Sequence, residues 1–131
     1  MTRVAKAVAQ VLGIALVFLG LFAFMPNPVI GAEGFFGTDA AHNGIHLALG
    51  LMLLLASTRG EQTSTFALYL VCFMLTIFAF LSYRQLGRWD KAMLLDAVLV
   101  TASDTWLHLA MALVAATGAK MNTSSKQLFY E

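Results

Sequence analysis

Charged residues and cysteines are scarce in this chain of 131 residues. Only 11% of the residues are charged, whereas 60% are hydrophobic. A soluble domain of this size cannot hide so much apolar surface, so the composition excludes an ordinary soluble globular protein. The single cysteine, Cys72, has no partner for an intramolecular disulfide and says nothing about the redox compartment. We interpret it as a small apolar packing residue.

The chain also lacks the sequence patterns that most strongly indicate catalysis, zinc or nucleic acid. Paired cysteines and a His-Glu-x-x-His sequence are both absent. The lysines and arginines flank the apolar runs and form no separate basic patch, which argues against nucleic-acid binding. Ser103 adjoins Asp104, and neighbouring residues on a helix point in different directions, so they do not form a nucleophilic pair. We therefore expect a protein that is not an enzyme.

Four long apolar runs dominate what is present. They cover residues 7–25, 40–57, 65–83 and 92–117, each close to the length that crosses a bilayer as a helix. Runs of this length are too continuous for barrel strands, and the backbone in hydrocarbon must bond internally, so helices are expected. The sequence predicts an all-α fold, a single transmembrane domain built as a four-helix bundle. The first run is too long for a typical secretory signal, and we expect it to remain as a helix.

The distribution of lysine and arginine predicts the orientation. Four spans place two groups of basic residues on opposite sides, with none in the loop of residues 26–39. The larger group marks the cytoplasmic side, so both termini are expected there. The two groups are Arg3, Lys6, Arg59, Lys120 and Lys126 on one side, and Arg84, Arg88 and Lys91 on the other.

Capping residues predict where the helices begin. Thr38 or Asp39 is expected to cap the second span, Thr63 or Ser64 the third, and Asp90 the fourth. A fourth helix that starts at residue 90 and ends at residue 118 would be about 42 Å long at 1.5 Å per residue. It would therefore have to tilt or protrude from the bilayer.

The two halves of the chain share short sequence matches. Residues 21–25 resemble residues 77–81, and His-Leu-Ala occurs at residues 46–48 and again at 108–110. This predicts two helical hairpins that enter the membrane in the same direction, related by an axis along the membrane normal. Such an axis would place His46 and His108 in equivalent positions that face each other.

Small and polar residues recur at helical spacing within three of the spans, which predicts faces that point toward protein and not toward lipid. On the first span these residues are Gln10, Gly13, Val17 and Gly20. On the second they are His42, Asn43, His46 and Gly50. On the fourth they are Ala97, Thr101, Asp104, His108, Ala112 and Ala115.

Three functions remain open for the intramembrane histidines and aspartate. The first is a scaffold or accessory subunit of a larger membrane complex, in which the network of His42, Asn43, His46, Asp104 and His108 locks the bundle. In that network, hydroxyls such as Thr101 and the amide of Gln10 would give further support. The second is a cofactor-binding subunit: three imidazoles and a carboxylate suit zinc, copper or iron, and His46 with His108 could hold a haem iron or a pigment magnesium. The third is a proton or ion pathway.

The third span carries many aromatic residues that could contact either the lipid bilayer or another protein, including a second copy of this chain. They are Phe66, Tyr69, Phe73, Phe78 and Phe80.

Two motifs resemble the signatures of a bacterial four-helix membrane family catalogued as a domain of unknown function. Residues 43–50 are similar to Asn-x-x-His-Leu-x-x-Gly, and residues 104–109 to Asp-Asn-x-Leu-His-Leu. Thr105 stands where the second signature has asparagine, and Ala112 where it tends to have glycine. The resemblance covers most of the chain and implies a location in the bacterial inner membrane, with no assigned activity.

Overall fold

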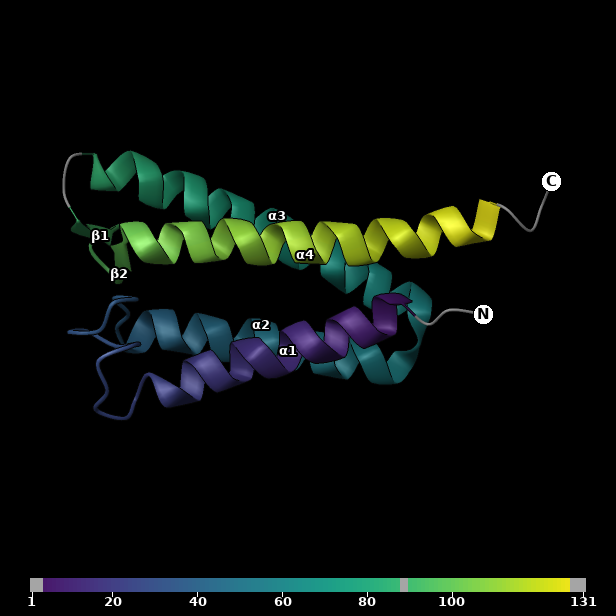
Figure 1. Ribbon diagram of the computed structural model, residues 1–131, viewed down its shortest axis with the longest axis horizontal. Coiled ribbons are helices and arrows are strands. Elements are labelled where there is room, and N and C mark those ends of the chain that lie inside the picture. Colours follow the sequence, from purple (N-terminus) through teal and green to yellow (C-terminus); the bar gives the residue numbers. More distant parts are fainter. Residues whose placement is uncertain (1–3, 88–89, 128–131) are drawn as a thin grey trace.

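The computed structural model describes residues 4–87 and 90–127, with side chains up to residue 121. Four helices and one short two-stranded sheet follow each other along these residues, and Figure 1 shows their arrangement. The elements are α1 (Val4–Phe22), α2 (Ala40–Arg59), α3 (Glu61–Leu86), β1 (Lys91–Leu94), β2 (Val98–Thr101) and α4 (Ala102–Gln127).

The helices are arranged as two helical hairpins. The most extensive contacts are those of α1 with α2 and of α3 with α4. The junction of α2 with α3 lies at one end of the molecule, and residues 23–39 lie with the β1–β2 hairpin at the other (Figure 1). The start of α1 and the end of α4 lie at the same end as the α2–α3 junction. The prediction of four helices is therefore confirmed, and they pair as the predicted hairpins do. That the hairpins enter a membrane in the same direction stays a prediction.

The outer surface of the bundle is apolar. By length and composition, α1, α2 and α3 are able to cross a membrane. Helix α4 is long but less apolar, so its passage through the bilayer stays a prediction. Large apolar side chains cover outward-facing positions of all four helices. Such a surface suits contact with lipid hydrocarbon better than contact with water. These side chains include Val11, Phe18, Leu51, Leu55, Phe66, Phe73 and Leu113.

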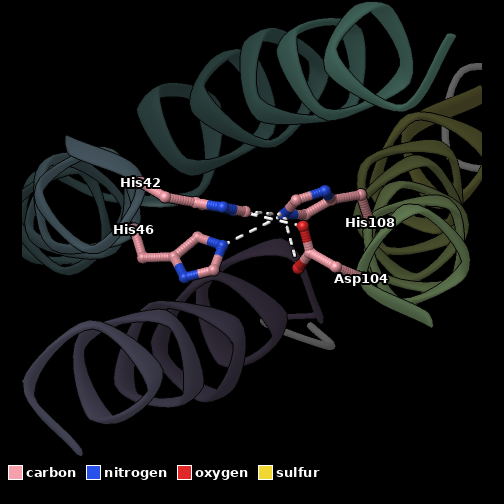
Figure 2. Close-up of side chains that lie close together, drawn as sticks. All are labelled: His42, His46, Asp104 and His108. Carbon is pink, nitrogen blue, oxygen red and sulfur yellow. Dashed lines mark hydrogen bonds and ion pairs between the residues drawn. The ribbon is translucent and has the colours of Figure 1, made fainter. Parts of the chain in front are cut away.

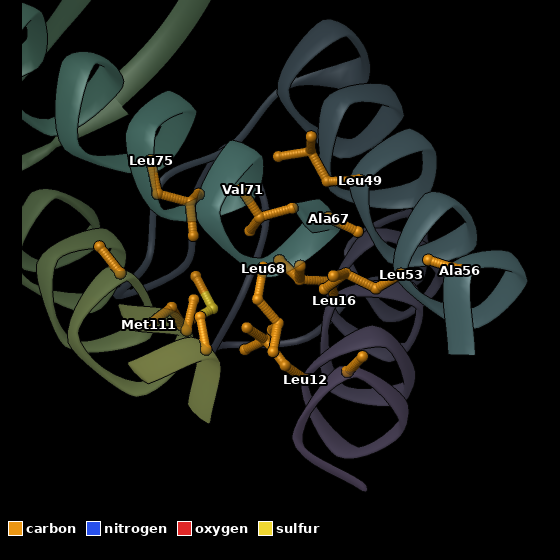
Figure 3. Packing of buried hydrophobic residues seen from close by; sticks show 14 of the residues in the cluster. Leu12, Leu16, Leu49, Leu53, Ala56, Ala67, Leu68, Val71, Leu75 and Met111 are labelled. Carbon is orange, nitrogen blue, oxygen red and sulfur yellow. The ribbon is translucent and has the colours of Figure 1, made fainter. Parts of the chain in front are cut away.

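One continuous hydrophobic core connects the two hairpins (Figure 3). Leucines and valine form its centre, and alanines line α1 and α4, where short side chains allow close helix contact. Gly13 of α1 and Gly50 of α2 also lie against each other: a Cβ atom added to Gly50 would be 2.8 Å from the Gly13 carbonyl oxygen. The core includes Leu12, Leu16, Leu49, Leu53, Leu68, Val71, Leu75 and Met111.

The prediction that residues 92–117 form one apolar helix is wrong at its start. Residues 91–101 instead form an antiparallel hairpin in which Leu94 pairs with Val98. A short apolar run cannot be distinguished from a strand by periodicity alone, and β-branched valines favour the strand. Leu86, Leu94 and Val100 form a second, smaller core under the hairpin. Consequently Ala97 and Thr101 do not lie on the helical face assigned to them.

Helix boundaries differ from the predictions in several places. Asp39 caps α2 as predicted, since its side chain accepts a hydrogen bond from the backbone N–H of His42. Helix α3 begins at Glu61, after Gly60 with a positive φ of 112°, and neither Thr63 nor Ser64 caps it. Helix α1 ends at Phe22 and not at residue 25.

Candidate metal centre

Four side chains converge in the space between the two hairpins, near the end that carries the β1–β2 hairpin. His42 and His46 extend from α2, and Asp104 and His108 extend from α4 to meet them (Figure 2). Their exposed fractions are 0% for His42, 2% for His46, 1% for Asp104 and 1% for His108. We call these four residues the His3Asp cluster.

Helical spacing explains why each helix supplies two of the ligands. His42 and His46 are four residues apart on α2, and Asp104 and His108 are four residues apart on α4. Residues at this spacing lie on one face of a helix, one turn above the other. The two faces point at each other because each belongs to a different hairpin and both face the interior.

The distances within the cluster are short and similar. Nε2 of His108 lies 3.0 Å from Nε2 of His46 and 3.4 Å from Nε2 of His42. The carboxylate of Asp104 places Oδ2 3.4 Å from Nε2 of His42 and Oδ1 3.7 Å from Nε2 of His108. One ligand atom from each of the four residues lies within 4.8 Å of all the others.

These separations match those around a tetrahedral metal ion. Ligand atoms that are each 2.0 to 2.1 Å from a zinc ion are about 3.3 Å from one another in a tetrahedron. Four of the separations, at 3.0 to 3.7 Å, lie on both sides of that value, and the whole set lies within 4.8 Å. A single ion at the centre would therefore draw the more widely spaced ligand atoms together.

Hydrogen bonding within the described residues leaves the cluster unsatisfied. Neither carboxylate oxygen of Asp104 accepts a hydrogen bond there, and the Nδ1 atoms of His46 and His108 also have no partner. A buried ionised carboxylate without donors lowers the free energy of unfolding by several kcal/mol, about 3 or more, unless a cation compensates it or the group takes up a proton. In the scaffold hypothesis the network locks the bundle through such hydrogen bonds, and among the described residues Asp104 accepts none.

His42 differs from the other two histidines because the backbone fixes its ring. Nδ1 of His42 lies 2.7 Å from the carbonyl oxygen of Leu99 in strand β2. A carbonyl oxygen can only accept, so Nδ1 carries the hydrogen and the lone pair of the neutral ring is at Nε2. This lone pair faces the other ligand atoms, which is the arrangement of a histidine that binds a metal.

An aromatic ring forms one wall of the cluster. The centroid of Phe78 of α3 lies 5.2 Å from that of His42 and 5.0 Å from that of His108. Phe78 was predicted to belong to the outward aromatic face of the third span, and this is wrong. Its neighbours Phe66, Phe73 and Phe80 are exposed as predicted.

The remaining predicted network residues lie outside the cluster. Asn43 is buried, but its Oδ1 atom has no partner among the described residues. Thr101 precedes α4 and accepts hydrogen bonds from the N–H groups of Asp104 and Gly37. It therefore holds the N-terminal turn of α4, which carries Asp104. Gln10 is exposed on α1, and its predicted supporting role is wrong.

A haem or pigment held by His46 and His108 together does not fit the observed geometry. Two imidazoles on opposite sides of a bound ion need Nε2 atoms about 4 Å apart, with the ring of the cofactor between them. The Nε2 atoms of His46 and His108 are only 3.0 Å apart, and His42 converges on the same point. The three imidazoles suit one small ion.

Sequence reasoning missed Leu99 and the second role of Asp39. Besides capping α2, Asp39 accepts a hydrogen bond from the backbone N–H of Leu99. No side-chain pattern identifies Leu99, because only its backbone groups take part. The inward position of Phe78 could have been found from its spacing, because buried Leu75 and Ser82 lie three and four residues away.

Comparisons with known proteins add no relatives. No family model, no curated protein and no solved structure matches this chain. The resemblance to a bacterial membrane family therefore stays a prediction.

Proposed function

We propose that this protein is an integral membrane protein that holds one transition-metal ion between α2 and α4, and that its role is structural and not enzymatic. The observation that carries the proposal is the convergence of four buried ligand atoms within 4.8 Å. The uncompensated carboxylate of Asp104 supports it, because a divalent cation supplies the missing positive charge.

The donor atoms favour zinc over other common metals. Three imidazoles and one carboxylate are nitrogen-rich, whereas calcium and magnesium prefer oxygen donors throughout. The donor set has no thiolate or thioether, the ligands that select Cu(I). Iron(II) and copper(II) also bind imidazole, but separations near those of a tetrahedron favour Zn²⁺.

The position of the ion explains how it would act on the fold. One pair of ligands comes from the α1–α2 hairpin and the other pair from the α3–α4 hairpin. Binding free energy at such a site is also folding free energy, because the unfolded chain does not hold the four ligands together. With four protein ligands and no exposed position, the site resembles closed structural sites more than open catalytic ones.

The cellular setting forms part of the same proposal. Three helices apolar enough to cross a membrane support a location in the lipid bilayer. The resemblance and the distribution of basic residues favour the bacterial inner membrane, with both termini in the cytoplasm. The exposed aromatic residues of α3 would contact lipid, a larger complex or a second copy of the chain, in keeping with an accessory subunit.

Elemental analysis of the purified full-length protein tests the proposal. The protein is purified in detergent with a tag that contains no histidine, because a polyhistidine tag binds the same metals. We expect about one equivalent of metal per chain, and no retained metal in Asp104→Asn or His46→Ala. Gln10→Ala, an exposed position on α1, is the control that keeps the full equivalent.

A metal-free wild-type protein that also fails to take up added Zn²⁺, Fe²⁺ or Cu²⁺ would contradict the proposal. The four side chains would then act as a polar network that fixes helix register. Retention of metal by Asp104→Asn and His46→Ala would contradict it equally, because binding would then lie elsewhere.

A further inference from the structure

We infer that Asp39 is a positioning residue of the metal centre, which acts through Leu99 to fix the nitrogen with which His42 binds the ion. The inference rests on the proposed function, since it concerns the same ion. Asp39 lies outside the His3Asp cluster and would touch neither the metal nor its other ligands.

Asp39 holds two segments that are distant in sequence. Its Oδ1 atom accepts a hydrogen bond of 2.9 Å from the N–H of His42. Its Oδ2 atom accepts a hydrogen bond of 2.9 Å from the N–H of Leu99, 60 residues away in strand β2. The same side chain therefore fixes the start of α2 against the hairpin.

Leu99 passes this restraint on to the imidazole of His42. The carbonyl oxygen of Leu99 lies 2.7 Å from Nδ1 of His42, so both backbone polar groups of Leu99 connect to the start of α2. If Leu99 moved, Nδ1 would lose its acceptor, and the ring could carry its hydrogen on Nε2 instead. A protonated Nε2 cannot bind a metal, so this tautomer would remove one ligand.

The restraint matters most at His42. Among the described residues, Nδ1 of His46 and Nδ1 of His108 have no hydrogen-bond partner, whereas Nδ1 of His42 has one. His42 is thus the ligand whose tautomer the protein selects by itself. It also lies closest in sequence to the loop that precedes α2.

Other contacts keep the hairpin in place when Asp39 is changed. Thr101 accepts a hydrogen bond from the N–H of Gly37 at 3.2 Å, and Nζ of Lys91 donates to the carbonyl oxygen of Ala32 at 3.0 Å. A variant at Asp39 can therefore be expected to fold. Serine is the suitable substitution, because it also caps helices well but is too short to reach Leu99.

The test compares the Zn²⁺ affinity of wild-type protein, Asp39→Ser and His42→Ala, each measured in detergent by competition with a chelator of known affinity. We expect Asp39→Ser to bind Zn²⁺ at least about tenfold more weakly than the wild type, the usual size of such indirect effects. The metal-free Asp39→Ser protein should stay folded, with a thermal midpoint somewhat below that of the metal-free wild type, because the cap is retained and the hydrogen bond to Leu99 is lost.

Cobalt(II) in place of zinc gives a readout that a purely structural role would not change. The visible spectrum of bound Co²⁺ reports its ligands, and we expect Asp39→Ser to shift it toward the spectrum of His42→Ala. In the double variant Asp39→Ser/His42→Ala, the affinity should equal that of His42→Ala alone, because the two residues act through one ligand.

Equal Zn²⁺ affinity in wild type and Asp39→Ser would overturn the inference while leaving the metal site standing. An undiminished effect of Asp39→Ser in the His42→Ala background would also overturn it, because Asp39 would then act independently of that ring. Absence of Zn²⁺ binding by the wild type would instead overturn the proposed function, and with it the inference.

Discussion

The Nε2 atoms of His46 and His108 lie 3.0 Å apart, although 62 residues separate them in the sequence and they belong to different hairpins. One shared hydrogen could join two neutral rings. However, Nε2 of His108 also lies 3.4 Å from Nε2 of His42, whose hydrogen is held on Nδ1 by Leu99. The hydrogen between His46 and His108 leaves Nε2 of His42 without a donor from either ring, whereas a cation at the centre would bind all four groups.

Zinc is expected to stabilise the protein through His108, the residue whose ligand atom lies near all the other three. For a site that exists only in the folded state, free Zn²⁺ at one hundred times the dissociation constant adds about 2.7 kcal/mol to the free energy of unfolding. We expect thermal unfolding in detergent to show a higher midpoint with Zn²⁺, and chelator to reverse the rise. His108→Ala should show no rise, whereas Gln10→Ala should respond as the wild type does.

The contact of α1 with α2 depends on Gly50. A Cβ atom at this position would lie 2.8 Å from both the Gly13 carbonyl oxygen and the Val17 nitrogen, which are backbone atoms of α1. We expect Gly50→Ala to lower the free energy of unfolding by about 1 to 3 kcal/mol, because the helices must move apart. Denaturation in mixed micelles would measure it.

Gly44, on the same helix, is the matched control. A Cβ atom there meets nothing within 4 Å, so Gly44→Ala should stabilise α2 by up to about 1 kcal/mol through helix propensity alone. Equal effects of the two substitutions would show that close packing at Gly50 is not needed.

The ligand set could be predicted from the sequence, because two physical rules act on the same residues. In a helix that crosses a membrane, hydrocarbon excludes polar side chains, so His46 and Asp104 are expected to face the interior. A spacing of four residues then placed His42 beside His46, and His108 beside Asp104. Neither rule places Gln10. It lies in the first two turns of α1, and its side chain is exposed.

Strand β2, which contacts His42 of the cluster, could not be predicted in the same way. Residues 98–101 are apolar enough to continue a membrane helix, and only the fold shows that they form strand β2. The contact of Leu99 with His42 involves a backbone carbonyl, which every residue has. Sequence patterns identify side chains only. The carbonyl oxygen of Leu99, which selects the tautomer of His42, therefore could not be found from the sequence.

Thr101 is expected to hold the first turn of α4, and with it Asp104. Its Oγ1 atom accepts hydrogen bonds from the N–H of Asp104 at 3.3 Å and from that of Gly37 at 3.2 Å. Thr101→Ala removes both, and loss of a helix cap lowers the free energy of unfolding by about 1 kcal/mol. Zn²⁺ affinity should fall as well, because the carboxylate of Asp104 is no longer fixed.

Thr117→Ala provides the comparison for Thr101→Ala. Thr117 is exposed on α4, and within the described part of the chain its Oγ1 donates to a carbonyl of its own helix, that of Leu113. We expect it to change neither stability nor Zn²⁺ affinity by a measurable amount. If Thr117→Ala and Thr101→Ala behaved alike in both measurements, the cap would have no role at the metal centre.

Phe78 is expected to control how fast the ion leaves. Its ring packs against His42 and His108 and separates them from the outer face of α3, where Phe80 is 60% exposed. The apolar shell of a metal site limits access of water and chelators. Phe78→Ala opens a cavity beside two ligands, so Zn²⁺ should be lost to excess chelator faster, and the free energy of unfolding should fall by about 2 kcal/mol.

Phe80→Ala removes the same side chain two residues further along α3, on the exposed surface. This variant should leave the rate of Zn²⁺ loss unchanged, because the Phe80 side chain lies on the outer surface and does not pack against the ligands. Chelator competition followed over time in both variants separates the two positions. If Phe78→Ala released Zn²⁺ no faster than Phe80→Ala, the ion would reach solvent by a path that does not pass Phe78.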